Sequence, residues 1–251
     1  RFMDVSKPLS ADDFVGCEVI FNLAAEHRDD VRPLERYREV NVDGAKHVCE
    51  VATEAGVNKI IFTSSVAIYG FADPDTGEQG RVNPFNEYGR TKYAAELIYR
   101  DWLRLDPDNR SLVIVRPTVI FGEGNRGNVH NLLRQISTNK FAMFGDGKNV
   151  KSMAYVENVA SFLSYSVSFG PGFHLYNYID KPDMTMNELV RTCRKIIFKK
   201  ENVGLRFPKI LGMVIGIFFD CLAFLTRISF PVSLIRVKKF VSTTQFSSSV
   251  G

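Results

Sequence analysis

Tyr88 and Lys92 are the residues whose types and spacing best suit chemistry. They stand four positions apart in a segment predicted to be helical, so both side chains lie on one helix face, with Cβ atoms about 5–6 Å apart. A lysine ammonium beside a phenol favours the phenolate and lowers the pKa of the phenol. Such a phenol can remove or donate a proton beside a carbonyl carbon. Spacing alone does not separate this pair from a chance Tyr–Lys pair on a structural helix.

Ser65 is a second candidate, because it follows an apolar segment that ends in hydroxyl groups. Ligand groups in open parallel sheets lie at the carboxyl ends of strands. A serine hydroxyl both donates and accepts, so it can hold a sugar oxygen against the tyrosine. The structural alternative is a turn serine that satisfies backbone groups.

The elements that must position these residues alternate between strand and helix. Apolar and β-branched runs predict strands at 18–25, 59–64 and 111–116, and helical patterns occupy 33–56 and 87–104. Strands that alternate with helices of more than ten residues indicate right-handed βαβ units and a parallel sheet.

The alternation loosens after Pro117, which predicts a mixed, smaller lobe. Helices are expected near 128–137, 157–167 and 186–199, and strands near 141–144, 150–155 and 174–179. The predicted fold class is therefore α/β, with a Rossmann-like, doubly wound parallel sheet and a smaller mixed C-terminal lobe.

Several short motifs occur in a fixed order along the chain. They are Asn22-Leu-Ala-Ala25, Asn41-Val-Asp-Gly44, Phe62-Thr-Ser-Ser65 with Tyr69-Gly70, Tyr88 with Lys92, and Arg116-Pro117. Their order and spacing resemble the NAD-dependent epimerase/dehydratase branch of the extended short-chain dehydrogenases. The resemblance implies NAD as cofactor. It also implies an NAD-binding Rossmann domain over 1–120, with later returns near 150–180, and a lobe over 121–251 that mainly binds substrate.

The resemblance also implies roles for individual residues. Tyr88 would be the acid/base, Lys92 would bind the nicotinamide ribose, and Ser65 would bind the reacting sugar hydroxyl. Asn41 resembles the helix asparagine that supports the lysine. Further cofactor contacts fall on Asp4 and Val5 near the adenine, Leu23, Ala24 and Ala25 along the cofactor backbone, Thr63, and Pro117 and Thr118 near the nicotinamide. Substrate contacts fall on Ser65, Val66, Asn125, Arg126, Asn128 and Lys151.

The family begins with a glycine-rich βαβ unit, and this sequence starts near the family's third strand, so we expect the first βαβ unit to be missing. One literal G-x-G-x-x-G does occur, at 122–127. The dinucleotide fingerprint opens a βαβ unit, whereas this segment follows the Tyr–Lys pair. We therefore interpret it as the glycine-containing substrate loop that the family places after the Arg-Pro strand.

Dehydratase members carry an acidic pair after the catalytic hydroxyl, and here Val66 and Ala67 stand there, which argues against a 4,6-dehydratase. The resemblance then favours C4 epimerisation of a nucleotide sugar, a UDP-hexose, through a transient 4-keto sugar. Val119 and Lys151 depart from the epimerase pattern. An NAD(P)-dependent sugar reductase, a 3β-hydroxysteroid-type or lipid-linked oxidoreductase, and a non-catalytic fragment or scaffold stay open as alternatives.

Charge is spread unevenly along the chain. The net charge is +4, yet residues 191–239 hold 11 Lys/Arg against 2 acidic residues. This suits an anionic ligand, but it lacks the aromatic interleaving and the motifs of a nucleic-acid surface, so no nucleic acid is expected. The cysteines and histidines are scattered, so no metal site is expected.

The apolar run 210–225 needs separate treatment. It is shorter than the about 20 residues of a membrane span, and it contains Asp220, which is costly at the bilayer centre. We expect a buried or partly buried helix, with peripheral membrane contact or a true span as alternatives. The predicted location is cytoplasmic or membrane-associated. We also expect a homodimer through the helices 33–56 and 87–104 and a disordered tail over 242–251.

Overall fold

The computed structural model describes residues 3–28, 31–125, 127–226, 230 and 233–249, and it divides into two compact units. The first unit comprises residues 1–118, 154–179 and 246–251. The second comprises residues 119–153 and 180–245.

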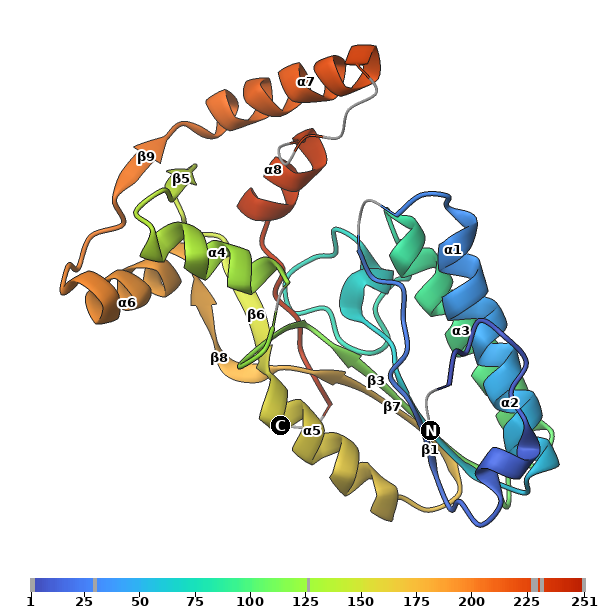
Figure 1. Cartoon of the computed structure of the whole chain (residues 1–251). Helices are drawn as coiled ribbons and strands as arrows, with labels where there is room; N and C mark the ends of the chain where they lie inside the picture. Colours follow the sequence, from blue (N-terminus) through green and yellow to red (C-terminus); the bar gives the residue numbers. More distant parts are fainter. Residues whose placement is uncertain (1–2, 29–30, 126, 227–229, 231–232, 250–251) are drawn as a thin grey trace. The chain divides into compact units, whose positions relative to one another are not determined.

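A four-stranded parallel sheet forms the centre of the first unit, in the order β1-β2-β3-β7 (Figure 1). The strands are β1 (Ile20–Asn22), β2 (Lys59–Thr63), β3 (Ser111–Pro117) and β7 (Gly172–Tyr178). Strand β3 is buried along its whole length, because it has a neighbour on each side and side chains covering both faces. The predicted α/β class with a parallel sheet is confirmed.

Helices cover both faces of this sheet (Figure 1). They are α1 (Glu35–Tyr37), a π-helical segment (Arg38–Asp43), α2 (Gly44–Glu54), α3 (Glu87–Arg104) and α5 (Val156–Tyr165). Ile60 and Phe62, alternate residues of β2, pack in the same cluster as Val48 of α2 and Tyr99 of α3. On β7, the ring of Tyr176 lies 5.5 Å from that of Phe162 on α5.

The second unit contains two small sheets. Strands β4 (Val119–Phe121), β6 (Val150–Tyr155) and β8 (Asp180–Thr185) form one, and β5 (Ala142–Phe144) and β9 (Leu205–Phe207) form the other. Its helices are α4 (Asn128–Ser137), α6 (Met186–Phe198), α7 (Lys209–Thr226) and α8 (Leu234–Val241). Thr185 and Glu188 form a capping box that begins α6, which the sequence Thr-x-x-Glu encodes.

Two expectations from the sequence are wrong. Helix α7 exists where predicted, but it is not a core helix, because only 11% of its 18-residue apolar window is buried. The predicted disordered tail is ordered through Ser249. Phe246 is buried against Ile68 and Tyr69, and the backbone N–H of Ser247 bonds to the carbonyl of Thr76. One buried aromatic residue and a β-bridge outweigh the polar composition of this segment.

A buried ion pair joins α3 to β3. Arg116 donates from Nε to Glu96 Oε1 at 2.8 Å and from Nη2 to Glu96 Oε2 at 2.5 Å, and both side chains are almost fully inaccessible to water. Arg116 Nη1 also donates to the Tyr69 hydroxyl at 2.7 Å, which in turn donates to Asn177 Oδ1 at 2.9 Å. The planar guanidinium of β3 thus binds α3 directly and reaches β7 through the hydroxyl of Tyr69.

Replacing Glu96 with Gln should lower the free energy of unfolding by about 3–5 kcal/mol, because the Arg116 charge would stay buried without its counter-ion. Asp101→Asn is the matched control, since Asp101 pairs with Arg104 on the exposed face of the same helix and is 69% exposed. It should change stability by less than about 1 kcal/mol. Chemical denaturation measures both, and equal effects would contradict a special role for the buried pair.

Candidate active site

Lys92 lies on the buried face of α3, and its side chain is almost completely enclosed. Its Nζ stands 4.1 Å from the centre of the Phe62 ring, and within the described residues it forms no hydrogen bond or ion pair. Burial lowers the pKa of Lys92 from its ordinary value of 10.5 to about 7, partly opposed by the charge of Glu96 one turn further along the helix. A titratable group, with no hydrogen-bonding partner among the described residues, is thereby held beside the end of strand β2.

Tyr88 lies in the first turn of α3, which begins in a well-defined place. The side chain of Asn86 caps the helix by accepting from the backbone N–H of Gly89 at 3.0 Å. Gly89 allows close packing there, because a Cβ at this position would stand 2.6 Å from the carbonyl oxygen of Ala67. The N-terminus of α3 therefore packs directly on the 3-10 turn Val66–Tyr69, which follows Ser65.

Ser65 caps this turn. Its Oγ accepts from the backbone N–H of Ala67 at 3.1 Å, which stabilises the turn. A hydroxyl that accepts in this way can still donate its proton to an acceptor on a ligand. The structure thus brings together, within the first unit, the turn that carries Ser65 and the helix that carries Tyr88 and Lys92.

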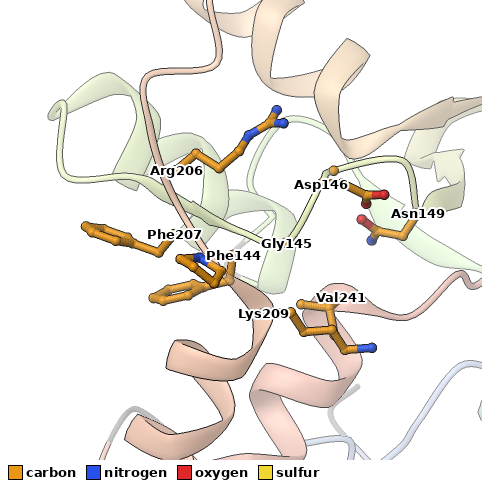
Figure 2. A pocket seen from close by; sticks show the side chains of 10 residues that line it. Phe144, Gly145, Asp146, Asn149, Arg206, Phe207, Lys209 and Val241 are labelled. Atoms are coloured by element: carbon orange, nitrogen blue, oxygen red, sulfur yellow. The ribbon is translucent and has the colours of Figure 1, made fainter.

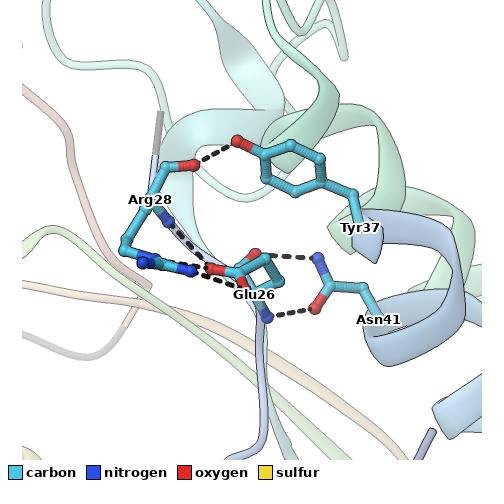
Figure 3. Close-up of polar contacts among 4 residues, drawn as sticks. All are labelled: Glu26, Arg28, Tyr37 and Asn41. Atoms are coloured by element: carbon cyan, nitrogen blue, oxygen red, sulfur yellow. Dashed lines mark hydrogen bonds and ion pairs between the residues drawn. The ribbon is translucent and has the colours of Figure 1, made fainter. Parts of the chain in front are cut away.

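Asn41 supports α3 from the π-helical segment. Figure 3 shows its side-chain amide paired with the backbone of Glu26. Its side-chain amide donates to Thr91 Oγ1 at 2.9 Å and to the carbonyl of Glu26 at 3.0 Å, and its Oδ1 accepts from the backbone N–H of Glu26 at 2.9 Å. Because Thr91 directly precedes Lys92, the Asn41 amide holds in place the turn of α3 that carries the lysine. Single π-bulges are frequent at functional sites, because the wider turn re-aims a side chain.

Two buried hydroxyls lie at the carboxyl end of β2 without partners. Thr63 Oγ1 and Ser64 Oγ have no hydrogen-bond partner within the described residues. Leaving a buried hydroxyl unsatisfied costs about 1–3 kcal/mol. Their position is the place where open parallel sheets bind ligands.

The remaining predicted cofactor residues lie in the first unit. Asp4 accepts from both the backbone N–H and the hydroxyl of Ser6, and these bonds lower the pKa of Asp4. The carbonyl of Val5 is 2.9 Å from His47 Nδ1. Asn22 holds the next segment by accepting from the N–H of Ala24 at 3.0 Å.

Leu23 is 58% exposed, and Ala25 is partly exposed. At the end of β3, Pro117 and Thr118 are buried, and Thr118 bonds to the carbonyl of Tyr178. All of these predicted cofactor residues lie at or just beyond strand ends, apart from Asp4 and Val5.

The predicted substrate residues of the second unit serve local structure. Asn125 donates to the carbonyl of Ile120 at 3.1 Å and accepts from the N–H of Gly127 at 2.8 Å, which shapes the loop before α4. Asn128 is exposed at the first turn of α4, and Arg126 lies outside the described residues.

Lys151 has a role that the sequence did not predict. Its ammonium donates to the carbonyl oxygens of Lys239 at 2.8 Å and Ser242 at 2.6 Å, at the C-terminal end of α8. A cation is favourable there, because the last carbonyls of a helix lack partners. Burial lowers the pKa of Lys151 to about 8.

A pocket of about 760 Å³ lies wholly within the second unit (Figure 2). Figure 2 shows Phe207 beside Phe144 on one side of the pocket, Asp146 beside Asn149 on the other, and Lys209 beside Val241 below. Arg206 donates to Asn187 and Asp146 accepts from the N–H of Lys148, so these charged groups already have partners. None of the predicted catalytic or cofactor residues lines this pocket.

Glu96, Arg116 and Tyr69 form a buried network beside the site that the sequence motifs did not predict. In the sequence, Arg116 stands out only as part of the Arg-Pro motif. The sequence does contain a signal for this network. An arginine in a largely apolar strand needs a buried partner, and Glu96 follows Lys92 by one helical turn.

Comparison with known proteins agrees with this geometry. The profile of the NAD-dependent epimerase/dehydratase family matches residues 3–177. An N-acetyl-alpha-D-glucosaminyl-diphospho-ditrans,octacis-undecaprenol 4-epimerase of Escherichia coli O157:H7 is 48% identical over 235 residues, which is 93% of this chain and 70% of that protein. A UDP-glucose 4-epimerase of Vibrio cholerae is 28% identical over 64% of this chain and 50% of its own length.

The crystal structure of a UDP-glucuronic acid 4-epimerase from Bacillus cereus in complex with NAD superposes with a TM-score of 0.72 at 18% identity, covering 82% of this chain and 68% of that one. This likeness shows a shared fold. The chain belongs to the NAD-dependent epimerase/dehydratase family, and the family and its cofactor NAD, both inferred from sequence motifs, are confirmed.

The pKa of Lys92 gives a test of its burial. Between pH 7 and about 10.5 the unfolded chain holds this proton and the folded chain has released it, so folded-state stability rises with pH across that window. In Lys92→Met this contribution is absent. Without NAD, the variant should therefore be more stable than the wild type near pH 7, and the difference should shrink as pH rises, by up to about 1.4 kcal/mol per unit. Denaturant titrations of the unliganded full-length proteins at several pH values measure this, and a pH-independent difference would contradict the assignment.

Proposed function

We propose that the protein is an NAD-dependent C4 epimerase whose substrate is an N-acetylhexosamine joined through a diphosphate to a polyprenol. The observation that carries this proposal is the placement of Tyr88 and Lys92 on one supported helix, α3, in a chain 48% identical to an epimerase of that kind over 93% of its length. The reaction that names this relative supplies the substrate class.

The groups left unsatisfied at the site fit NAD. The buried ammonium of Lys92 and the hydroxyl of Thr63 need acceptor or donor oxygens, which the cofactor's ribose would offer. Asn41 would hold the turn of helix that carries the lysine. When bound, NAD accepts a hydride from the sugar and returns it. Leu23, Ala24 and Ala25 would lie along the cofactor, with Asp4 and Val5 near its adenine and Pro117 and Thr118 near its nicotinamide.

The chain's own residues would handle the proton. Tyr88 would take the proton of the C4 hydroxyl as the carbon is oxidised, and would give it back after the 4-keto sugar has turned its other face. The Lys92 ammonium would favour the phenolate form of Tyr88. Ser65 would donate its hydroxyl proton to the sugar oxygen and so orient it, which lowers the entropic cost of reaching the reactive geometry.

A nucleotide sugar, the substrate expected from the sequence motifs, is the second candidate. It is favoured by the similarity to the Vibrio cholerae UDP-glucose 4-epimerase. Both candidates present a diphosphate next to the sugar, and they differ in what lies beyond it: a uridine or an isoprenoid chain. A homodimer through the two long helices remains part of the proposal.

Tyr88→Phe in the full-length protein should lower turnover at least about 100-fold, the scale for losing a general acid/base, while NAD binding is kept. Tyr93→Phe is the matched control, because Tyr93 lies on the same helix and packs in an apolar cluster instead. It should retain activity. Lys92→Met should weaken NAD binding as well as turnover. Steady-state rates measure turnover, and NAD titrations measure cofactor affinity. Near-normal turnover of Tyr88→Phe would overturn the catalytic role of Tyr88.

The substrate class is tested by offering both diphosphates. Proton NMR would follow the C4 configuration of GlcNAc in UDP-GlcNAc and in a short-chain polyprenyl-diphosphate GlcNAc, each with NAD and the full-length protein. We expect interconversion of the polyprenyl form at a higher kcat/KM, without net NADH. Faster conversion of UDP-GlcNAc would establish the nucleotide sugar instead, and no conversion of either would refute the epimerase.

A further inference from the structure

Helix α7 buries its small residues and exposes its large apolar ones. Gly212 and Gly216 are buried, whereas six large apolar side chains spaced along one face are exposed. Their exposed fractions are Ile210 74%, Val214 56%, Ile217 48%, Phe218 61%, Phe224 86% and Leu225 77%. The mean hydropathy of the helix is 1.9. A surface helix of a water-soluble domain turns its apolar stripe inward, so α7 is arranged the other way round.

Close packing against α8 fixes this orientation (Figure 1). A Cβ on Gly216 would stand 2.8 Å from the backbone N and Cα of Leu234, so only glycine lets the two helices approach this closely. Asp220, one turn further along the same face, accepts from the N–H of Leu234 at 3.0 Å. The α7–α8 hairpin, defined here by the two helices Lys209–Thr226 and Leu234–Val241, is therefore joined through its small and polar side. The large side chains stay outside.

Positive charge accompanies the apolar face. Residues 199–239 contain eight Lys/Arg and only two acidic residues, Glu201 and Asp220. Glu201 is paired with Lys195 at 2.6 Å, and Asp220 accepts from a backbone N–H, so both acidic groups are engaged and a net positive charge remains when both are counted. Lys209 begins α7, and Lys238 is exposed on α8. An apolar stripe flanked by basic residues matches the acyl boundary and the phosphates of an anionic lipid surface.

We propose that the α7–α8 hairpin docks the protein on an anionic bilayer, with α7 lying in the plane of the interface. A membrane-spanning orientation of α7 agrees less well with the structure than an interfacial one. The helix is about 27 Å long against a hydrocarbon core of about 30 Å, and α8 would carry Arg236, Lys238 and Lys239 into the core with it. A second copy of this chain is also a less suitable partner for the exposed face of α7 than a bilayer, because pairing two such faces would bring like charges together.

This inference extends the proposed function without depending on it, since docking concerns α7 and α8 while the catalytic residues lie on the first unit. It would place the enzyme where an isoprenoid-linked sugar resides. A protein that docks but acts on UDP-sugars, or one that acts on lipid-linked sugars but does not dock, would separate the two proposals.

The test is flotation of the full-length protein with vesicles of phosphatidylglycerol and phosphatidylethanolamine, compared with vesicles of phosphatidylcholine alone. Leu225→Asp should reduce the vesicle-bound fraction at least about tenfold. Leu105→Asp is the matched control, because Leu105 is also 77% exposed but follows α3 in the first unit. It should float like the wild type. Lys238→Glu should weaken binding to the anionic vesicles and reduce its sensitivity to salt.

Four results would overturn the proposal. The wild type could stay unbound on both kinds of vesicle, or Leu225→Asp could float as well as Leu105→Asp. Resistance of bound protein to high salt and alkaline carbonate would show a membrane span. A dimer in sedimentation that Leu225→Asp dissociates, without vesicle binding, would show an interface between copies. Thermal unfolding of each variant, and its activity on a water-soluble short-chain substrate, confirm that the fold is intact.

Discussion

The buried pair of Arg116 and Glu96 is the interaction on which the arrangement of the site depends. Glu96 lies one turn beyond Lys92 and two beyond Tyr88, so the bidentate contact with Arg116 fixes how α3 is rotated about its axis. Because Arg116 also reaches Tyr69, the same guanidinium connects α3 with the loop that follows Ser65. Two ions that are buried without water are stable only when their mutual geometry is good. This requirement fixes one rotation of α3 about its axis.

Lys92 shows the cost of such a site. Its ammonium is enclosed beside Phe62, and burial holds the pKa of Lys92 near 7. Burying this charge destabilises the unliganded protein, and the fold does not require a lysine here, so its presence points to a ligand. The unsatisfied hydroxyls of Thr63 and Ser64 lie at the end of the adjoining strand. Asn41, in a π-helical turn, and the capped start of α3 hold these groups in place. Unmet polar groups gather where a ligand is expected, which agrees with membership of an NAD-dependent family.

Sequence periodicity predicted the main elements of the first unit, because β2, β3 and α3 are long enough for their apolar patterns to be unambiguous. Helix α3 begins and ends at the predicted residues, Glu87 and Arg104. The failures have physical reasons. Helix α7 was expected in the core because its composition is apolar, whereas composition cannot show that its glycines face inward. Strands β4, β8 and β9 were missed because they are short or polar. The contact of Lys151 with the carbonyl oxygens at the end of α8 could not be read from the sequence, and its predicted contact with substrate stays a prediction.

The most direct measurement of the central claim follows a deuterium label at C4 of the sugar. If Tyr88 moves the proton while a single bound NAD takes and returns the hydride, the inverted product should keep the deuterium at C4 and no NADH should accumulate. Mass spectrometry of the product and absorbance at the NADH band would report both quantities. Loss of the label to water, or a stoichiometric yield of NADH with oxidised sugar, would contradict the account and indicate a different reaction on the same fold.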